Sequence, residues 1–190
     1  LTKSEWEAVT EIDVEGGYNG AKIEDLTGIE YFPNLTKLNC SGNALTKLDL
    51  SANTNLVDLS CADQMVSVEV APVTDQNENF DLLTLFDDWS WVGNLNVQGA
   101  TLANDGKTVI YDYTATIITV AYQYDTRSNN ENSIMSVTLT LYPQQVISEE
   151  RFPDAAFRQY VSDQIDTDGD GILTKSEWEA VTEIDVEGGY

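Results

Sequence analysis

The sequence predicts an α+β chain that is mostly β: a short repeated coil, then a small antiparallel β-sandwich, then a helix-loop-helix. Three observations support this order. A six-residue pattern recurs within residues 9–70, and apolar residues alternate with polar ones along residues 80–142. An acidic twelve-residue loop follows an amphipathic segment near the C-terminus. The spacing of the apolar residues in the repeated, alternating and amphipathic segments matches the element that each predicts.

Residues 9–70 are predicted to form the coil. Four blocks share the template apolar, two polar, apolar, polar, apolar: VTEIDV (9–14), LTKLNC (35–40), LTKLDL (45–50) and LVDLSC (56–61). VSVEV (66–70) resembles a shortened last copy, and Asn43 and Asn53 follow two of the blocks at the same offset. The pattern L-x-x-L-x-L/C-x-x-N is typical of a leucine-rich repeat, in which short strands stack. A helix is the alternative for the L-x-x-L spacing alone.

The apolar positions of these blocks are expected to share one buried core. They are Val9, Ile12, Val14, Leu35, Leu38, Cys40, Leu45, Leu48, Leu50, Leu56, Leu59 and Cys61. Cys40 and Cys61 occupy equivalent positions, so we expect buried thiols on neighbouring turns. A disulfide is the alternative, although side chains on adjacent parallel strands point the same way.

Residues 71–146 are predicted to form the β-sandwich, because the apolar period changes to two. The expected strands are residues 80–85, 89–97, 107–113, 116–124 and 133–142. Phe86, Trp89 and Trp91 lie among several tyrosines in this segment. We interpret these aromatic residues as core and cross-strand packing, and a carbohydrate-binding platform is the alternative.

Residues 147–182 are predicted to form an EF-hand, because DTDGDGILTKSE (166–177) matches its calcium loop. Gly171 occupies the position where the loop must bend sharply. Phe152-Pro153 is expected to open the entering helix, with an apolar face formed by Phe157, Tyr160, Val161 and Ile165. The predicted Ca²⁺ ligands are Asp166, Asp168, Asp170, the carbonyl of Ile172, Thr174 directly or through water, and both carboxylate oxygens of Glu177. The alternative is an acidic surface turn that binds no ion.

The chain also repeats itself at this loop. Residues 173–190 are identical to residues 1–18, so the sequence returns to its own beginning at Leu173. Residues 1–8 are then a partial EF-hand with its exit helix, and residues 183–190 begin a further repeat unit. We interpret the chain as a window, slightly longer than one unit, from a tandem array. A cloning artefact or a deliberate permutation is the alternative.

Composition excludes several classes of function. The formal net charge is −24, from nine Lys and Arg against 33 Asp and Glu, which argues against nucleic acid and anionic membranes as partners. The chain has no histidine, so Ser-His-Asp and Cys-His catalysis and His-ligated zinc are excluded. No apolar run is long enough for a membrane span. We expect no enzymatic activity, although composition alone does not exclude a glycosidase that uses two carboxylates.

In the order helix-loop-helix, coil, β-segment, the unit resembles internalin-type surface proteins of Gram-positive bacteria. The residues that carry this resemblance are FPDAAFRQYV with DTDGDGILTKSE, the LTKLxC and LTKLDL blocks, and residues 80–142. The sequence is more similar still to the leucine-rich repeat proteins of gut Firmicutes. The resemblance implies an EF-hand cap, leucine-rich repeats, an immunoglobulin-like β-sandwich and an extracellular or cell-surface location. The complete calcium loop, the very short coil and the repeated unit depart from internalins.

The calcium loop also resembles that of dockerins. A dockerin has two such loops close together, whereas here the complete copy and the partial copy lie at opposite ends of the chain.

These observations predict an extracellular structural and adhesive repeat unit of a tandem array or filament. Calcium is expected to stiffen the junction between neighbouring copies. The alternative function is an adhesin that binds a host protein or a glycan through the coil or the β-sandwich.

Overall fold

The computed structural model describes residues 2–74 and 77–185, and these residues are mostly β. The strands are β1 (Glu11–Asp13), β2 (Lys37–Asn39), β3 (Asp58–Ser60), β4 (Gln64–Val70), β5 (Asn77–Asp81), β6 (Val92–Gln98), β7 (Thr101–Leu102), β8 (Thr108–Asp112), β9 (Ile118–Asp125), β10 (Ile134–Pro143), β11 (Gln145–Val146) and β12 (Ile172–Leu173). The helices are α1 (Lys3–Glu7), α2 (Ala155–Gln164) and α3 (Lys175–Glu179), with 3-10 turns η1 (Ile29–Tyr31), η2 (Leu82–Leu85) and η3 (Trp89–Trp91). The prediction of a mostly β chain with few helices is confirmed.

The chain divides into two compact units, each built from three segments. The first unit contains Leu1–Val66, Leu82–Val97 and Thr119–Thr140. The second contains Ser67–Asp81, Gln98–Ile118 and Leu141–Tyr190. None of the helices in the described part of the chain is long and apolar enough to cross a membrane.

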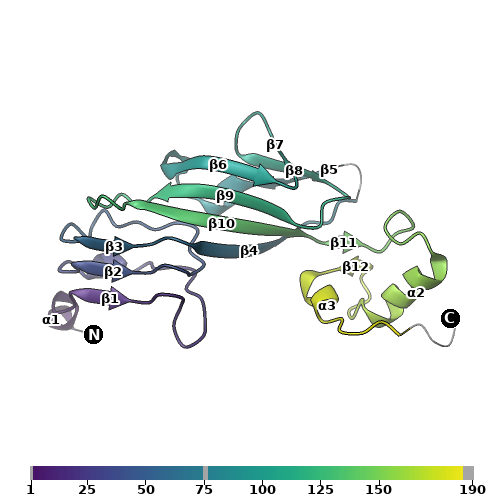
Figure 1. Cartoon of the computed structure of the whole chain (residues 1–190), viewed down its shortest axis with the longest axis horizontal. Coiled ribbons are helices and arrows are strands. Elements are labelled where there is room, and N and C mark those ends of the chain that lie inside the picture. The colour runs from purple at the N-terminus through teal and green to yellow at the C-terminus, as the bar shows by residue number, and fades with distance from the viewer. Residues whose placement is uncertain (1, 75–76, 186–190) are drawn as a thin grey trace. The chain divides into compact units, whose positions relative to one another are not determined.

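In the first unit, β1, β2 and β3 lie side by side as a parallel sheet (Figure 1). Ile12 pairs in register with Leu38, and Leu38 with Leu59. Leu38 and Leu59 are buried, while Lys37 and Asp58 beside them are exposed. This alternation is the period of two that the repeated blocks predict. Residues 45–50 form no strand, yet Leu45, Leu48 and Leu50 are buried on another side of the coil.

Nine of the twelve expected core residues of the coil are buried. The prediction was wrong for Val9, Ile12 and Val14, which are only half-buried. The reason is position, because β1 is an edge strand with β2 on one side only. Cys40 and Cys61 are buried free thiols, as predicted.

Buried amide side chains close the turns of the coil. Asn43 Nδ2 donates to the carbonyls of Val14 and Cys40, both at 2.9 Å. Asn53 Nδ2 donates to the carbonyl of Ile29, also at 2.9 Å. Each asparagine therefore satisfies backbone carbonyls inside the bend, where water is excluded.

Residues 66–70 do not form a last turn of the coil. They belong to β4, which neighbours β10 in a four-stranded sheet of order β4-β10-β9-β6. A five-residue alternating segment fits a coil strand and a longer sheet strand equally well, so its sequence does not choose between the two. The longer sheet offered more pairing, because β4 extends over seven residues.

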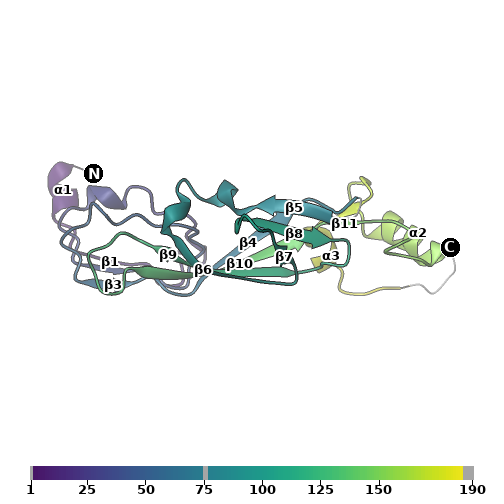
Figure 2. The ribbon, with the colours of Figure 1, turned by 90° about the horizontal axis from the view of Figure 1, so that it is seen from above.

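Alternate residues of β9 and β10 are buried, as expected for strands with one face on a core. These inward residues are Ile118, Val120, Tyr122, Tyr124, Met135, Val137, Leu139 and Leu141. In the second unit, β5, β8 and β7 form an antiparallel sheet with β8 in the centre (Figure 2).

Two expected strands are strands only in part. The segment 80–85 ends its strand at Asp81 and continues as η2. The segment 89–97 begins with η3, because the Asp88 side chain accepts the N–H of Ser90 at 2.9 Å and starts a tight turn. Phe86 is buried, with ring centroids 5.5 Å from Trp89 and 5.2 Å from Tyr122, so it packs in the core.

Candidate metal centre

The acidic loop lies between α2 and α3. Asp154 caps α2 by accepting the N–H of Phe157 at 2.8 Å, so Pro153 precedes the cap and lies outside the first turn. Tyr160 and Val161 are buried, as expected of the apolar face. Phe157 differs from that expectation, because 37% of its surface is exposed.

Two glycines set the path of the loop. Gly171 has a φ of +80°, which accords with the sharp bend expected there. Gly169 has a φ of +73°, and sequence reasoning did not single it out. Both values lie in the left-handed region that glycine adopts at little cost.

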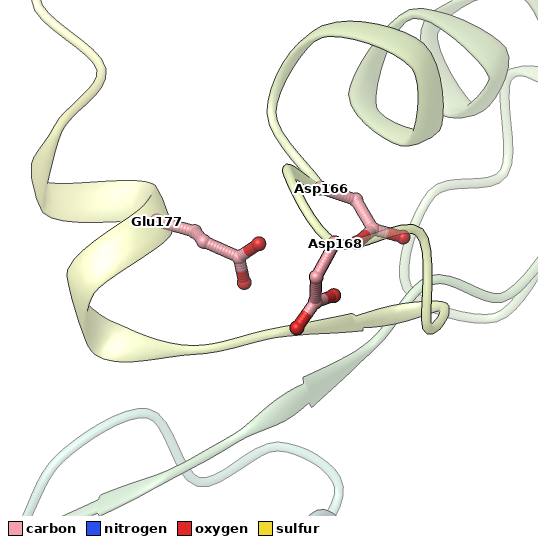
Figure 3. A group of neighbouring side chains, drawn as sticks. All are labelled: Asp166, Asp168 and Glu177. Atoms are coloured by element: carbon pink, nitrogen blue, oxygen red, sulfur yellow. The ribbon is translucent and has the colours of Figure 1, made fainter.

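Three carboxylates converge at the loop. Asp166, Asp168 and Glu177 each offer an oxygen, and these oxygens lie within 4.8 Å of one another. Figure 3 shows Glu177 reaching from α3 toward the two aspartates of the loop. Asp166 and Glu177 are buried and Asp168 is exposed, so the cluster opens to solvent on one side.

The Glu177 carboxylate is held by hydrogen bonds to both of its oxygens. Oε1 accepts from the N–H and hydroxyl of Thr167 at 2.7 and 2.9 Å. Oε2 accepts from the N–H and hydroxyl of Thr174, both at 2.9 Å. These bonds, the Thr174 N–H first, lower the pKa of Glu177 to about 2 although burial opposes ionisation. Glu177 is therefore charged and aimed at the loop.

The aspartates are oriented by the loop backbone. Asp166 accepts the N–H of Gly169 at 2.8 Å and that of Gly171 at 2.9 Å. The Asp170 N–H lowers the pKa of Asp168, but desolvation and the Asp170 and Glu177 carboxylates outweigh it and raise this pKa above its ordinary value. Like charges at short range favour a cation between them.

The other predicted ligands lie outside this triad. Asp170 Oδ1 accepts the N–H of Ile172 at 2.7 Å. The Thr174 hydroxyl is engaged with Glu177, and Ile172 pairs with Val146 in the β11–β12 ladder.

The donors fit calcium. Ca²⁺ takes six to eight oxygen ligands, and carboxylates are its usual protein donors. Asp166, Asp168 and Glu177 would hold the ion, and its chemical contribution would be to fix the end of α2 to the start of α3. The N-terminal copy contains Glu5, which bonds to Thr2 as Glu177 bonds to Thr174, but it has no counterpart of the aspartates.

Contacts that the sequence did not reveal attach the loop to the rest of the second unit. β12 pairs with β11 in an antiparallel ladder, which Ile147 N–H extends by donating to the Gly171 carbonyl at 2.9 Å. The Lys175 N–H donates to Glu69, and its ammonium lies 4.1 Å from the ring centroid of Tyr142. A two-residue strand is too short to show an alternating pattern, so the sequence could not have indicated this attachment.

No family model matches the chain, and the comparison with curated proteins found no match. Similar solved structures include the CBM51-2 and INT domains of ZmpB from Clostridium perfringens, at 18% identity and a TM-score of 0.45. They also include the functional domain of InlJ from Listeria monocytogenes, described as including a cysteine ladder, at 17% identity and a TM-score of 0.45. Both alignments cover 75% of this chain, but only 31% and 35% of the solved chains. At these TM-scores the likeness carries no functional argument.

Proposed function

We propose that this chain is an extracellular structural and adhesive repeat unit of a tandem array, with calcium stiffening the junction between units. The proposed unit has a leucine-rich coil, a β-sandwich and an EF-hand. The observation that carries the proposal is the identity of residues 173–190 with residues 1–18. The segment that ends the calcium loop is thus also the segment that begins a coil. The proposed role is not enzymatic.

The register of the coil supports leucine-rich repeats. β2 and β3 pair in register, so Leu38 and Leu59 occupy equivalent positions on successive turns. Gln64 follows Leu59 at the same offset at which Asn43 follows Leu38, and it is also fully buried. Its amide donates to the Cys61 carbonyl at 3.2 Å and accepts the Leu45 N–H at 3.1 Å. Gln64 thus takes the place of the repeat asparagine in the last turn.

Contacts around α3 support a role for calcium at the junction. The ring of Trp178 lies 6.3 Å from that of Tyr142, and Lys175 contacts both Tyr142 and Glu69. The exit helix is therefore anchored on the β-region that precedes it in the chain. An ion bridging Asp166 and Glu177 would fix this helix, and with it the segment leading to the next coil.

Calcium titration followed by a measurement of stiffness tests the proposal. Calorimetry of the full chain should give one calcium site per molecule. A longer chain of several joined repeat units, examined by small-angle scattering, should be longer and stiffer with calcium than with EDTA. The same chain with Glu177→Gln in every unit is the control and should not respond. Absence of calcium binding at millimolar concentration, or stiffness unchanged by EDTA, contradicts the proposal.

A polar cavity in the first unit favours glycan binding as a second candidate function. Its volume is about 510 Å³, and its lining includes Asp25, Lys47, Asp49, Asp87, Trp91 and Arg127. Arg127 pairs with Asp49 and lies 5.3 Å from the ring centroid of Trp91. Carboxylates beside an aromatic ring provide the polar and apolar contacts that a sugar requires. Binding on a glycan array that Trp91→Ala abolishes would support this candidate, and no binding by the unaltered chain would exclude it for the glycans tested.

A further inference from the structure

The repeated segment occupies two different surroundings in one molecule. In the N-terminal copy, residues 9–14 lie along the edge of the coil. Ile12 pairs with Leu38 in the β1–β2 ladder. The Thr10 carbonyl accepts the N–H of Lys37 at 3.1 Å, and Val14 N–H donates to Asn39 at 2.8 Å. This copy is thus bound as a strand.

The described part of the C-terminal copy is bound differently. Its helix α3 is anchored on Tyr142, but residues 181–185 form no strand. The identity of residues 181–186 with residues 9–14 predicts that they form the same strand. The described residues differ from this prediction because β1 needs β2 as its partner, and none of the described strands pairs with residues 181–185. Residue 186 lies outside the described residues.

Ile12 and Ile184 are equivalent positions of the repeated segment, and Ile184 is the more exposed of the two. It lines an apolar groove of about 630 Å³ together with Phe157, Trp178 and Val181. There 51% of its surface is exposed, whereas Ile12 is half-buried on the coil. Burial therefore favours the environment that the coil provides.

The helix of each copy uses contacts that the other copy lacks. Trp6 lies 5.3 Å from the ring of Tyr31 on the coil, while Trp178 contacts Tyr142. The Lys3 side chain is 86% exposed, whereas that of Lys175, over Tyr142, is 26% exposed. If the C-terminal copy kept its contact with Tyr142 and also made the coil contacts of the N-terminal copy on another molecule, it would join the two molecules.

We propose that residues 181–185 can bind the β2 edge of a second copy of the same chain. When residues 9–13 leave the edge of β2, residues 181–185 of a neighbouring molecule take their place and pair with Lys37–Asn39. The contact is head to tail, so it can repeat from one molecule to the next, as a ring or as an open fibre according to the rotation between neighbours. The inference rests on one element of the proposed function, namely that residues 173–190 begin a further coil. It does not depend on calcium.

Residues 9–13 and 181–185 have the same sequence. Replacing one by the other on β2 therefore forms the same contacts that it breaks. The resident segment prevails since it is tethered beside the coil at high effective concentration. Weakening the resident segment alone must therefore release the edge of β2 to a neighbour. β1 is short and paired on one side only, so one substitution suffices for this purpose.

The test uses the full chain with Ile12→Asp, which places a charge on the inward side of β1. Its mass, from light scattering at low and at high micromolar concentration in physiological salt, should rise with concentration through dimers to longer oligomers. The matched control is Ile12→Asp with Ile184→Asp, in which the donor segment carries the same lesion. This double variant should remain monomeric. Ile184→Asp alone should also be monomeric.

Two outcomes overturn the inference. One is a folded Ile12→Asp chain, judged by circular dichroism, that stays monomeric at the higher concentration. The other is equal association of the double variant, which would show that the bared coil end associates without the donor segment. If Ile12→Asp does not fold, Ile12→Ala takes its place, with Ile12→Ala/Ile184→Asp as its control. Calorimetric calcium binding and the stiffness of joined units are separate readouts, so failure here is distinguishable from failure of the proposed function.

Discussion

The side-chain amides of Asn43 and Gln64 donate to the same acceptor, the carbonyl of Cys40, at 2.9 and 3.0 Å. The two residues lie on successive turns of the coil, so the shared carbonyl links one turn to the next. Asn43 also accepts the N–H of Ile23 at 3.0 Å, which ties in the loop before the coil. The bends are thus held by side chains as well as by strand pairing.

Asn43→Leu should lower the free energy of unfolding by roughly 2–5 kcal/mol. The leucine fills similar volume but leaves the partly buried carbonyl of Val14 and N–H of Ile23 without their partner. Each unsatisfied group costs about 1–3 kcal/mol. Urea denaturation measures the change. Asn55→Leu is the control, because Asn55 is exposed and donates only to the Pro33 carbonyl. A cost for Asn43→Leu no larger than that of the control would contradict the role assigned to Asn43.

Leu48→Ala should cost roughly 2–5 kcal/mol, the range for large-to-small changes in a core. Leu48 is 4% exposed although its block forms no strand, so this change tests whether the side of the coil without strands carries core packing. Val57→Ala, at a residue that is 77% exposed, should cost less than about 0.5 kcal/mol. Equal midpoints for the two variants in a urea titration would refute the expected core.

Glu177→Gln should weaken calcium binding at least about tenfold, because the amide removes a negative charge from the loop. Glu5→Gln is a control with the same local sequence, since Glu5 occupies the equivalent position in the N-terminal copy. It should leave calcium affinity unchanged, because the aspartates of the loop have no counterpart there. Calorimetric titration of both variants decides the matter. An effect of Glu5→Gln equal to that of Glu177→Gln would place the ion elsewhere.

The coil should lose stability at alkaline pH. Burial raises the pKa of Cys40 to about 12 and that of Cys61 to about 11, whereas an unfolded thiol has a pKa of about 8.5. The folded state thus favours the protonated thiols. Their stabilising contribution is complete below the unfolded pKa and is lost as pH rises through the folded values. Melting temperature should therefore fall between about pH 9 and pH 11.

Thiol alkylation provides the control for this prediction. At mildly alkaline pH the folded chain should react slowly with iodoacetamide, and the urea-unfolded chain should react rapidly at both cysteines. A Cys40→Ala/Cys61→Ala chain should lose less stability than the unaltered chain over the same alkaline range. If it loses as much, the thiols are not the groups responsible.

The sequence predicted those parts of the fold that repeat or alternate. Leu38 and Leu59 recur at a fixed spacing, and each is buried on a strand as that spacing implies. It failed where two structures use the same alternation, as in residues 66–70, and where a side chain starts a turn, as Asp88 does before η3. Local patterns do not record which sheet a strand joins, because that choice depends on distant partners.

The candidate site shows the same division. The spacing of the acidic loop identified Asp166, Asp168 and Glu177, which the structure brings together. It gave no sign that Asp170 would turn to the Ile172 N–H, or that Thr167 would bond to Glu177. Those contacts depend on the backbone path around Gly169 and Gly171, which is set in three dimensions.

The β11–β12 ladder has a mechanical consequence. It joins Gln145 to Leu173 and so encloses residues 147–171 in a loop that a pull along the chain bypasses. Opposed forces on these two strands peel an antiparallel ladder one bond at a time, and peeling this one frees roughly 80 Å of extended chain. A bound ion between Asp166 and Glu177 would close a different, smaller loop, residues 167–176. Peeling the ladder would then release residues 147–165 first, and calcium would hold back only the remainder.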